Sequence, residues 1–225
     1  MKKLMYSFCL LLLCLNLPAQ TDKISTCPSP ILDMAESYLQ GQLPEWQLDP
    51  TDIAELWVTD YYQTTSIGTH HIYFTQAHRG IPISGAMINI AIDSQNKIHH
   101  TGHRLVNNLN EKINTTSPQL TAAEGLTHAL AYLGLPNAIL PRMIENPSTQ
   151  LWVFDGGTIS EEPIKIQLQY FIDKNKNLML SWHLAIRRID NSDFPSLHID
   201  AITGAIIDEH NYTHYCRFAG ANPYG

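Results

Sequence analysis

Histidines are the residues of this chain whose type and spacing come closest to a chemical site. They form three groups: His70 with His71, His99 and His100 with His103, and His210 with His214 and Cys216. Imidazole and thiolate are preferred zinc ligands, but zinc needs four such groups, or three and a water. Adjacent strand residues point to opposite faces, so each doublet offers one ligand per face. The alternatives are a metal site and ordinary strand histidines, and the spacing favours the second.

Signatures of catalysis are absent from the sequence. Neither H-E-x-x-H nor G-x-S-x-G occurs, and there is no glycine-rich phosphate loop. Ser84 lies in a segment shaped by glycine and proline. Asp93, Asp173 and Asp200 follow buried strands directly, where aspartate stabilises turns through local hydrogen bonds. We therefore expect no catalytic residue, no bound metal, no cofactor and no enzymatic activity in this chain.

The composition indicates a folded, acidic protein. Hydrophobic residues make up 44% and charged residues 16% of 225, and the formal charge is −7. Removal of residues 1–20 takes two lysines and no acidic residue, so the remaining chain is more acidic still. Nucleic acids and anionic membranes bind clusters of basic side chains, and this chain is acidic. Neither is therefore an expected partner.

The first 20 residues resemble a signal peptide. Lys2 and Lys3 precede the apolar run from Leu4 to Leu17, which is too short to span a bilayer comfortably. A cleavage site is expected at Ala19–Gln20, so the protein is predicted to be exported, either secreted or periplasmic. A lipoprotein signal at Cys14 is the weaker alternative, because the preceding Leu13 is bulky.

Two cysteines remain after signal cleavage, near the ends of the mature chain. Cys27 and Cys216 would pair in an oxidising compartment or stay as isolated thiols. Sequence alone does not fix their geometry, so both alternatives stay open.

The first half predicts one helix followed by four strands. Ser29 can cap a helix from Pro30 to about Gln40, and Gly41 can end it. Alternation of apolar residues then predicts strands. These are Glu55–Tyr62, His70–His78, Ala86–Asp93 and Lys97–Val106. Gly80, Pro82 and Gly85 are interpreted as the connection between the second and third strands.

The second half repeats this order after a polar stretch, Asn107–Pro118. Thr121 and Glu124 form a capping box, so a helix is predicted from there to Gly134 and Pro136. Strands are predicted at Gln150–Phe154, Ile164–Ile172, Leu178–Arg188, Leu197–Ile199 and Ala205–Asp208. Trp152 and Trp182 are expected in the core.

These elements predict an α+β fold of two modules, each a curved antiparallel β-sheet packed on one α-helix and similar to cystatin or PepSY domains. The expected boundaries are 1–20 for the signal peptide, 21–112 for the first module, 113–212 for the second and 213–225 for a C-terminal tail.

The string Tyr73-x-x-Gln76-x-x-x-Gly80-Ile81-Pro82-Ile83-x-Gly85 resembles the FTP (fungalysin/thermolysin propeptide) domain of secreted zinc metallopeptidases. Leu180-x-Trp182-x-Leu184 and Asp200-Ala201-x-Thr203-Gly204 resemble the PepSY-like module of fungalysin propeptides. Asn211–Phe218 is similar to the segment that leads toward the catalytic domain in that family. One departure is the turn Ser94–Lys97, which lacks the glycine usual in the family.

The resemblance implies a propeptide that templates the folding of a fungalysin-like zinc metallopeptidase and blocks its cleft. Zinc is then expected only in the partner peptidase. The candidate contact residues that it implies are Tyr73, Gln76, Gly80, Ile81, Pro82, Gly85, Trp182, Asp200 and Gly204. For Gln76, Gly80 and Pro82, the sequence favours a role in shaping one turn and satisfying its backbone. Contact with a partner is the alternative, and the two roles are compatible.

Because catalytic residues are expected after the tail, the chain is interpreted as a fragment, a truncated gene product or an inhibitor that acts in trans. The rival hypothesis is an exported binding or adhesion module that reuses the fold without a peptidase.

Overall fold

A computed structural model describes residues 27–135, 141–189 and 193–213. The predicted signal peptide, most of the predicted tail and Cys216 lie outside this part of the chain. The helical elements are α1 (Ser29–Trp46), the short 3-10 helix η2 (Pro50–Ile53), α2 (Leu109–Lys112) and α3 (Ala122–Tyr132). The first four strands are β1 (Leu56–Thr64), β2 (Thr69–His78), β3 (Ile81–Ile92) and β4 (Ile98–His103). The others are β5 (Met143–Ser148), β6 (Leu151–Phe154), β7 (Ile164–Ile172), β8 (Leu178–Ala185), β9 (Pro195–Asp200) and β10 (Ile206–Asn211).

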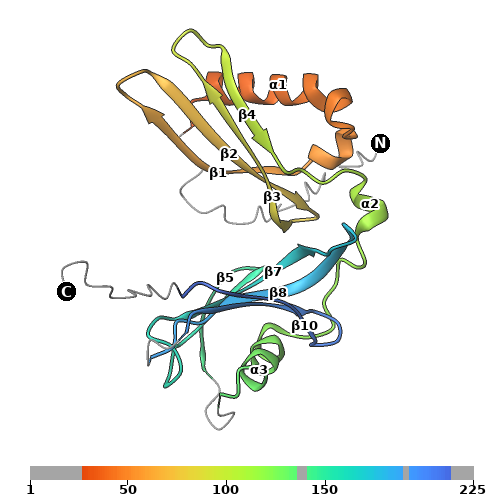
Figure 1. The fold of residues 1–225 in the computed structure, drawn as a ribbon, viewed down its shortest axis with the longest axis vertical. Coiled ribbons are helices and arrows are strands. Elements are labelled where there is room, and N and C mark those ends of the chain that lie inside the picture. The colour runs from red at the N-terminus through yellow and green to blue at the C-terminus, as the bar shows by residue number, and fades with distance from the viewer. Residues whose placement is uncertain (1–26, 136–140, 190–192, 214–225) are drawn as a thin grey trace, which may run out of the picture.

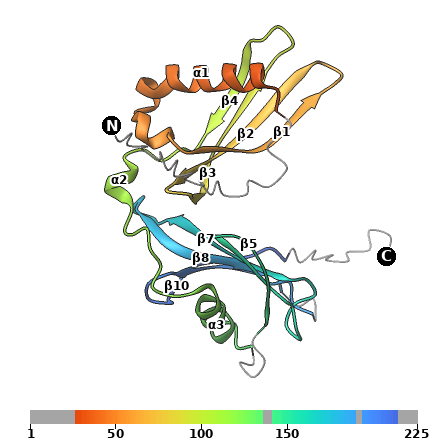
Figure 2. The ribbon, with the colours of Figure 1, turned by 180° about the vertical axis from the view of Figure 1, so that it is seen from behind.

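The ten strands are connected in one order through β3 and β7, and they lie in two antiparallel parts, each covered by one helix (Figure 1). We call β1 to β4 the first sheet and β5 to β10 the second sheet. β1 to β4 lie under α1, and β5 to β10 lie against α3 on the far side from the first sheet (Figure 2). The sheets join where β3 and β7 run in parallel, at the pair Ile83 and Tyr170. The predicted α+β fold is confirmed.

Helix α1 is longer than the sequence predicts. Gly41 and Pro44 lie inside it, and the backbone turns left-handed only at Gln47. The expected cap is also wrong, because the N-cap residue is Pro28 and no side chain bonds the first turn. The apolar stripe of Ile31, Ala35 and Leu39 continues to Leu43 and is buried. Burial of this longer face outweighs the low helix propensity of Gly41.

Helix α3 begins at the predicted capping box. The Thr121 side chain accepts a hydrogen bond from the Glu124 N–H, and the Glu124 carboxylate accepts one from the Thr121 N–H. The helix packs on Trp182, which is 1% exposed and donates its indole N–H to the Leu120 carbonyl at 3.0 Å. The core position predicted for Trp182 is confirmed.

Strand β3 contributes to both hydrophobic cores. Its second half, Ile88, Ile90 and Ile92, packs with α1 in the first core. Its first half, Ile81, Ile83 and Ala86, packs with α3 and the second sheet. The two sheets are therefore connected by a shared strand as well as by the linker, while the predicted domain boundaries remain a prediction.

The three aspartates expected at strand ends all stabilise turns. In each of them, Oδ1 accepts hydrogen bonds from two backbone N–H groups. The donors are Gln95 and Lys97 for Asp93, Asn175 and Asn177 for Asp173, and Ile202 and Thr203 for Asp200. In the first of these turns Asn96 takes a φ of 62°. Asparagine tolerates this left-handed conformation, which explains how the turn forms without the glycine usual in the family.

Candidate functional site

The predicted connection around Gly80 is a tight turn followed by a strand. Arg79 and Gly80, with φ of 50° and 75°, form a two-residue turn between the paired residues His78 and Ile81. Two successive positive φ values are typical of type I′ hairpins. The Glu55 carboxylate accepts the N–H groups of both turn residues at 2.7 Å. The interpretation of Pro82 and Gly85 as part of the connection was wrong, because both belong to β3.

The segment after this turn carries β3 away from its neighbour. Ala77 pairs with Pro82 and Thr75 with Met87, so the residues between Pro82 and Met87 bulge out of the β2–β3 ladder. Gly85 has a φ of 73°, which favours glycine at this bulge. The bulge brings Ile83 to Tyr170 of β7. The motif Gly80–Gly85 therefore forms the junction between the two sheets.

Gln76 lies opposite the bulge and is fully buried. Its amide nitrogen donates to the carbonyls of Asp52 and Val106, and its amide oxygen accepts from the Val106 N–H, all at 2.8 Å. Buried polar groups need such partners, since an unsatisfied one costs about 1–3 kcal/mol. Gln76 thus fixes the segment after β4 to the rest of the first module. The Gln76 side chain has no exposed surface that a partner could contact.

A buried carboxylate extends this network. Asp52 is 1% exposed and accepts the backbone N–H groups of Leu109 on one oxygen and of Asn108 on the other, both at 3.0 Å. It also accepts the Asp49 N–H at 2.9 Å. These bonds fix the start of α2, through which the chain enters the second module. Sequence reasoning missed this aspartate, because two of its backbone partners, Asn108 and Leu109, are far away in the chain.

The remaining candidate contact residues divide by exposure. Gly85 is exposed, and Tyr73 and Gly80 are half-buried. The others, Ile81, Pro82, Trp182, Asp200 and Gly204, are buried. Their burial indicates a structural role, whereas a contact role for Tyr73, Gly80 and Gly85 stays a prediction.

A cleft of about 460 Å³ opens between the two sheets on the faces that carry no helix. β1 and β2 supply Trp57, Thr59 and Thr75, and the bulge of β3 supplies the floor. The second sheet supplies Gln167, Gln169, His183, Ser196, His198, Asp208 and His210, and Tyr212 follows β10. Most of these side chains are neutral hydrogen-bonding groups.

The hydrogen bonds of His198 define its tautomer. The Ser181 hydroxyl donates its only hydrogen to the Gln169 carbonyl at 3.1 Å. Its contact of 3.1 Å with His198 Nδ1 must then use an Nδ1–H donor. Nε2 of the neutral ring is consequently an acceptor. Burial, and secondarily the nearby His183, lowers the pKa of His198 to about 3, so the ring is neutral at pH 7.

His183 lies beside His198 and bonds to a serine. The two ring centroids are 4.7 Å apart, and His183 Nε2 lies 2.9 Å from Ser196 Oγ. Burial lowers the pKa of His183, and the Asp208 charge partly opposes this shift. A serine and a neutral histidine resemble a nucleophile and its base. Among the described residues, however, no carboxylate hydrogen-bonds this histidine, and the surrounding strand N–H groups serve the ladder, so the pair is not assigned a catalytic role.

The histidine doublet of β2 points to opposite faces, as predicted. His70 Nδ1 meets the Tyr61 hydroxyl at 2.7 Å, while His71 stacks on Tyr62 with ring centroids 4.5 Å apart. In the described part of the chain, no three histidine, cysteine, aspartate or glutamate side chains are grouped as a metal site would require. His214 and Cys216 lie outside it, as does the predicted disulfide. Cys27 is half-buried and unpaired among the described residues.

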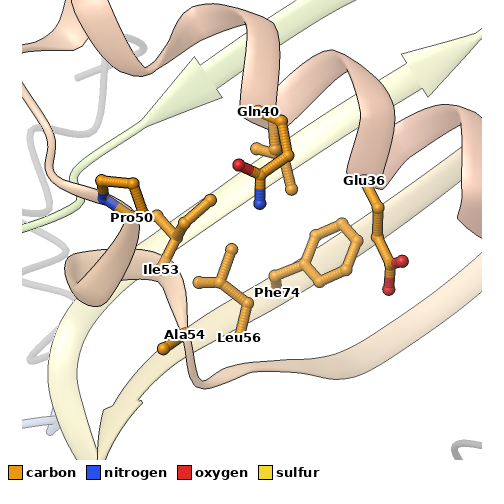
Figure 3. A pocket seen from close by; sticks show the side chains of 8 residues that line it. Glu36, Gln40, Pro50, Ile53, Ala54, Leu56 and Phe74 are labelled. Atoms are coloured by element: carbon orange, nitrogen blue, oxygen red, sulfur yellow. The ribbon is translucent and has the colours of Figure 1, made fainter.

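A second hollow, of about 270 Å³, lies under α1 (Figure 3). Ile53, Leu56 and Phe74 form its apolar floor, and Glu36 and Gln40 of α1 lie at its edge. The floor side chains belong to or pack against the first core. Apart from Glu36 and Gln40, all the residues that line this hollow are apolar.

Comparison with known proteins finds a family for the first sheet. Residues 54–104 match the family described as Fungalysin/Thermolysin Propeptide Motif, a stretch that contains β1 to β4. The first sheet is therefore similar to this propeptide motif. No curated protein matches the chain.

Among solved structures, the Bacillus megaterium YpeB C-terminal domain is similar at 10% identity and a TM-score of 0.36. The match covers 87% of this chain and 70% of that chain. Such a low score does not establish a shared fold. No helix in the described residues is both long and apolar enough to cross a membrane.

Proposed function

We propose that this chain is the propeptide part of a fungalysin-like zinc metallopeptidase, exported with it, and that it assists folding of the enzyme and inhibits it. The observation that carries the proposal is the FTP motif at residues 54–104. FTP modules belong to metallopeptidases and are not their catalytic parts. The chain acts in cis when it is joined to the enzyme and in trans when it is separate.

The architecture supports a template role. Gln76 and Asp52 fix the exit from the first module, and the β3 bulge fixes the second sheet against it. Such bonds hold two surfaces in one relative position before any partner arrives. A preorganised surface binds the folded enzyme without an ordering cost and stabilises it by mass action.

Two assays of the chain from Gln20 onward test this function. It should slow a purified fungalysin-type metallopeptidase and raise the yield of active enzyme on refolding from denaturant. It should hydrolyse neither proteins nor peptides. A serine protease that contains no zinc is the matched control and should be unaffected. The covalent tether raises the effective concentration of a propeptide, so the assay extends to tens of micromolar.

Absence of inhibition, of refolding assistance and of binding to the peptidase would contradict the proposal. The rival hypothesis, an exported binding module without a peptidase, would then take its place.

A further inference from the structure

The cleft between the sheets has the chemistry of a docking surface for a cationic segment. Asp208 is the one acidic residue among the described residues that line the cleft, and it is exposed. A second acidic residue, Asp60 of β1, is exposed as well. It pairs with Tyr73 of β2 in the first sheet. Within the described residues, no lysine or arginine lines the cleft. A cation placed here meets a carboxylate and no like charge.

His198 supplies a second and independent feature. It is 7% exposed, it lines the cleft, and it pairs across the ladder with Asp208. Ser181 holds its Nδ1–H, so Nε2 is an acceptor for which no hydrogen bond is found among the described residues. Because the ring lines the cleft, a donor from a ligand can bind this acceptor in place of water. Lysine and arginine carry donors and no acceptor, so they complement both His198 and Asp208.

The shape of the surface selects an extended segment. In the part of the chain that the structure describes, β10 ends the strand order and has β9 as its one strand partner, so its outer edge offers backbone groups to another strand. Trp57 and Tyr212 line the same cleft, and Tyr212 is 46% exposed. Aromatic faces attract lysine and arginine.

We propose that this cleft binds an extended segment of the partner peptidase, with a lysine or arginine of that segment placed between His198 Nε2 and the Asp208 carboxylate. This inference rests on the proposed function, since the peptidase is the partner. It assigns the contact to the helix-free faces of the two sheets.

Binding of the purified fungalysin-type metallopeptidase to the immobilised chain tests the proposal. Asp208→Asn and His198→Phe remove the charge and the acceptor while keeping similar side-chain shapes. Each should weaken binding about tenfold or more, which corresponds to the loss of a charge-assisted hydrogen bond. Glu145→Gln and His99→Phe change exposed residues of β5 and β4 outside the cleft and should leave binding unchanged.

A measurement on the unaltered protein guards against a folding defect of His198→Phe. A carbodiimide joins a carboxylate to a lysine in direct contact, and mass spectrometry locates the bond. We expect a cross-link from Asp208 to the peptidase, or, if arginine is the contact, protection of that arginine from a dicarbonyl reagent.

Three results are distinguishable. Weaker binding by the cleft variants together with the cross-link or the protected arginine supports the proposal. Binding by the wild type that neither cleft variant weakens, with no Asp208 cross-link or arginine protection, overturns the docking surface and leaves the propeptide function standing. Absence of any binding or inhibition by the wild type overturns both.

Discussion

Gln76 and Val106 are joined by two hydrogen bonds of 2.8 Å, one in each direction between the side-chain amide and the backbone. The side chain thereby makes the pair of bonds that a neighbouring strand residue would make. Because Val106 lies just before α2, this contact sets the point at which the chain leaves the first module. These bonds make Gln76 part of the internal framework of the protein.

Substitution of Gln76 by alanine should therefore destabilise the protein. The change leaves the N–H and carbonyl of Val106 and the carbonyl of Asp52 without partners, so we expect a loss of at least about 2 kcal/mol. Urea unfolding followed by circular dichroism measures it. Gln95→Ala, in an exposed turn of the same module, is the control and should change stability by less than about 0.5 kcal/mol. A midpoint for Gln76→Ala equal to that of the control would contradict this role.

The same substitution at two helical glycines should have opposite effects. A Cβ at Gly41 of α1 would meet no atom within 4 Å, whereas at Gly125 of α3 it would lie 2.8 Å from Cδ1 of Trp182. Gly41→Ala should stabilise by about 0.5–1 kcal/mol through helix propensity. Gly125→Ala should destabilise by about 1–3 kcal/mol, because the buried indole has to shift. Each variant serves as the control for the other in thermal unfolding, and two shifts of the same sign would count against this packing.

Acid should weaken the protein before its carboxylates protonate. The lowered pKa values of His198 and His183 mean that the unfolded chain takes up these protons first. Their contribution to the free energy of unfolding is fully present above pH 6.5, which is about the pKa of histidine in the unfolded chain. It is lost as the pH falls toward the folded pKa values, by about 1.4 kcal/mol per pH unit for each proton. Urea unfolding between pH 7.5 and 4.5 should show this slope.

His198→Asn identifies the source of that acid effect. Asparagine can still donate to Ser181 but does not titrate, so the slope below pH 6.5 should fall by about one proton. His99→Asn, at an exposed position of β4, should keep the wild-type slope. An unchanged slope in His198→Asn would place the acid sensitivity elsewhere.

Tyr170→Phe should leave the protein as stable as before or stabilise it by about 1 kcal/mol. The Tyr170 hydroxyl is buried at the junction of the sheets without a hydrogen-bond partner in the described structure, and burial raises its pKa to about 12. Removing an unsatisfied hydroxyl relieves its desolvation cost. Urea unfolding measures the change. A fall in the free energy of unfolding by more than about 1 kcal/mol would indicate a partner for this hydroxyl.

Local patterns predicted the local structure. The Thr121 capping box, the alternating strands and the turn aspartates need only neighbouring residues, and they formed where they were predicted. The exception is β3, which begins at Ile81 rather than at Ala86. β5 was missed, because Met143–Ser148 is largely exposed and contains Pro147, so no alternation marks it as a strand. The helix past Gly41 was missed because tertiary burial of Leu43 decides it.

The candidate site was harder to predict from sequence for the same reason. The cleft joins residues of seven strands that are distant in the chain. Two of its histidines, at positions 183 and 198, stood in no cluster that spacing could reveal. Their pairing depends on the register of β8 with β9, where they lie directly opposite each other.

The shared strand β3 makes the two halves unequal during synthesis. All side chains of the first core lie within residues 27–105, so this half is complete as soon as that length of chain has emerged. The second core draws Ile81, Ile83 and Ala86 from the first half, so it is finished only by docking onto a surface that already exists. The earlier half is thus a nucleus for the later one, and a shortened chain that starts after Asn107 would carry an apolar face that its own residues do not cover.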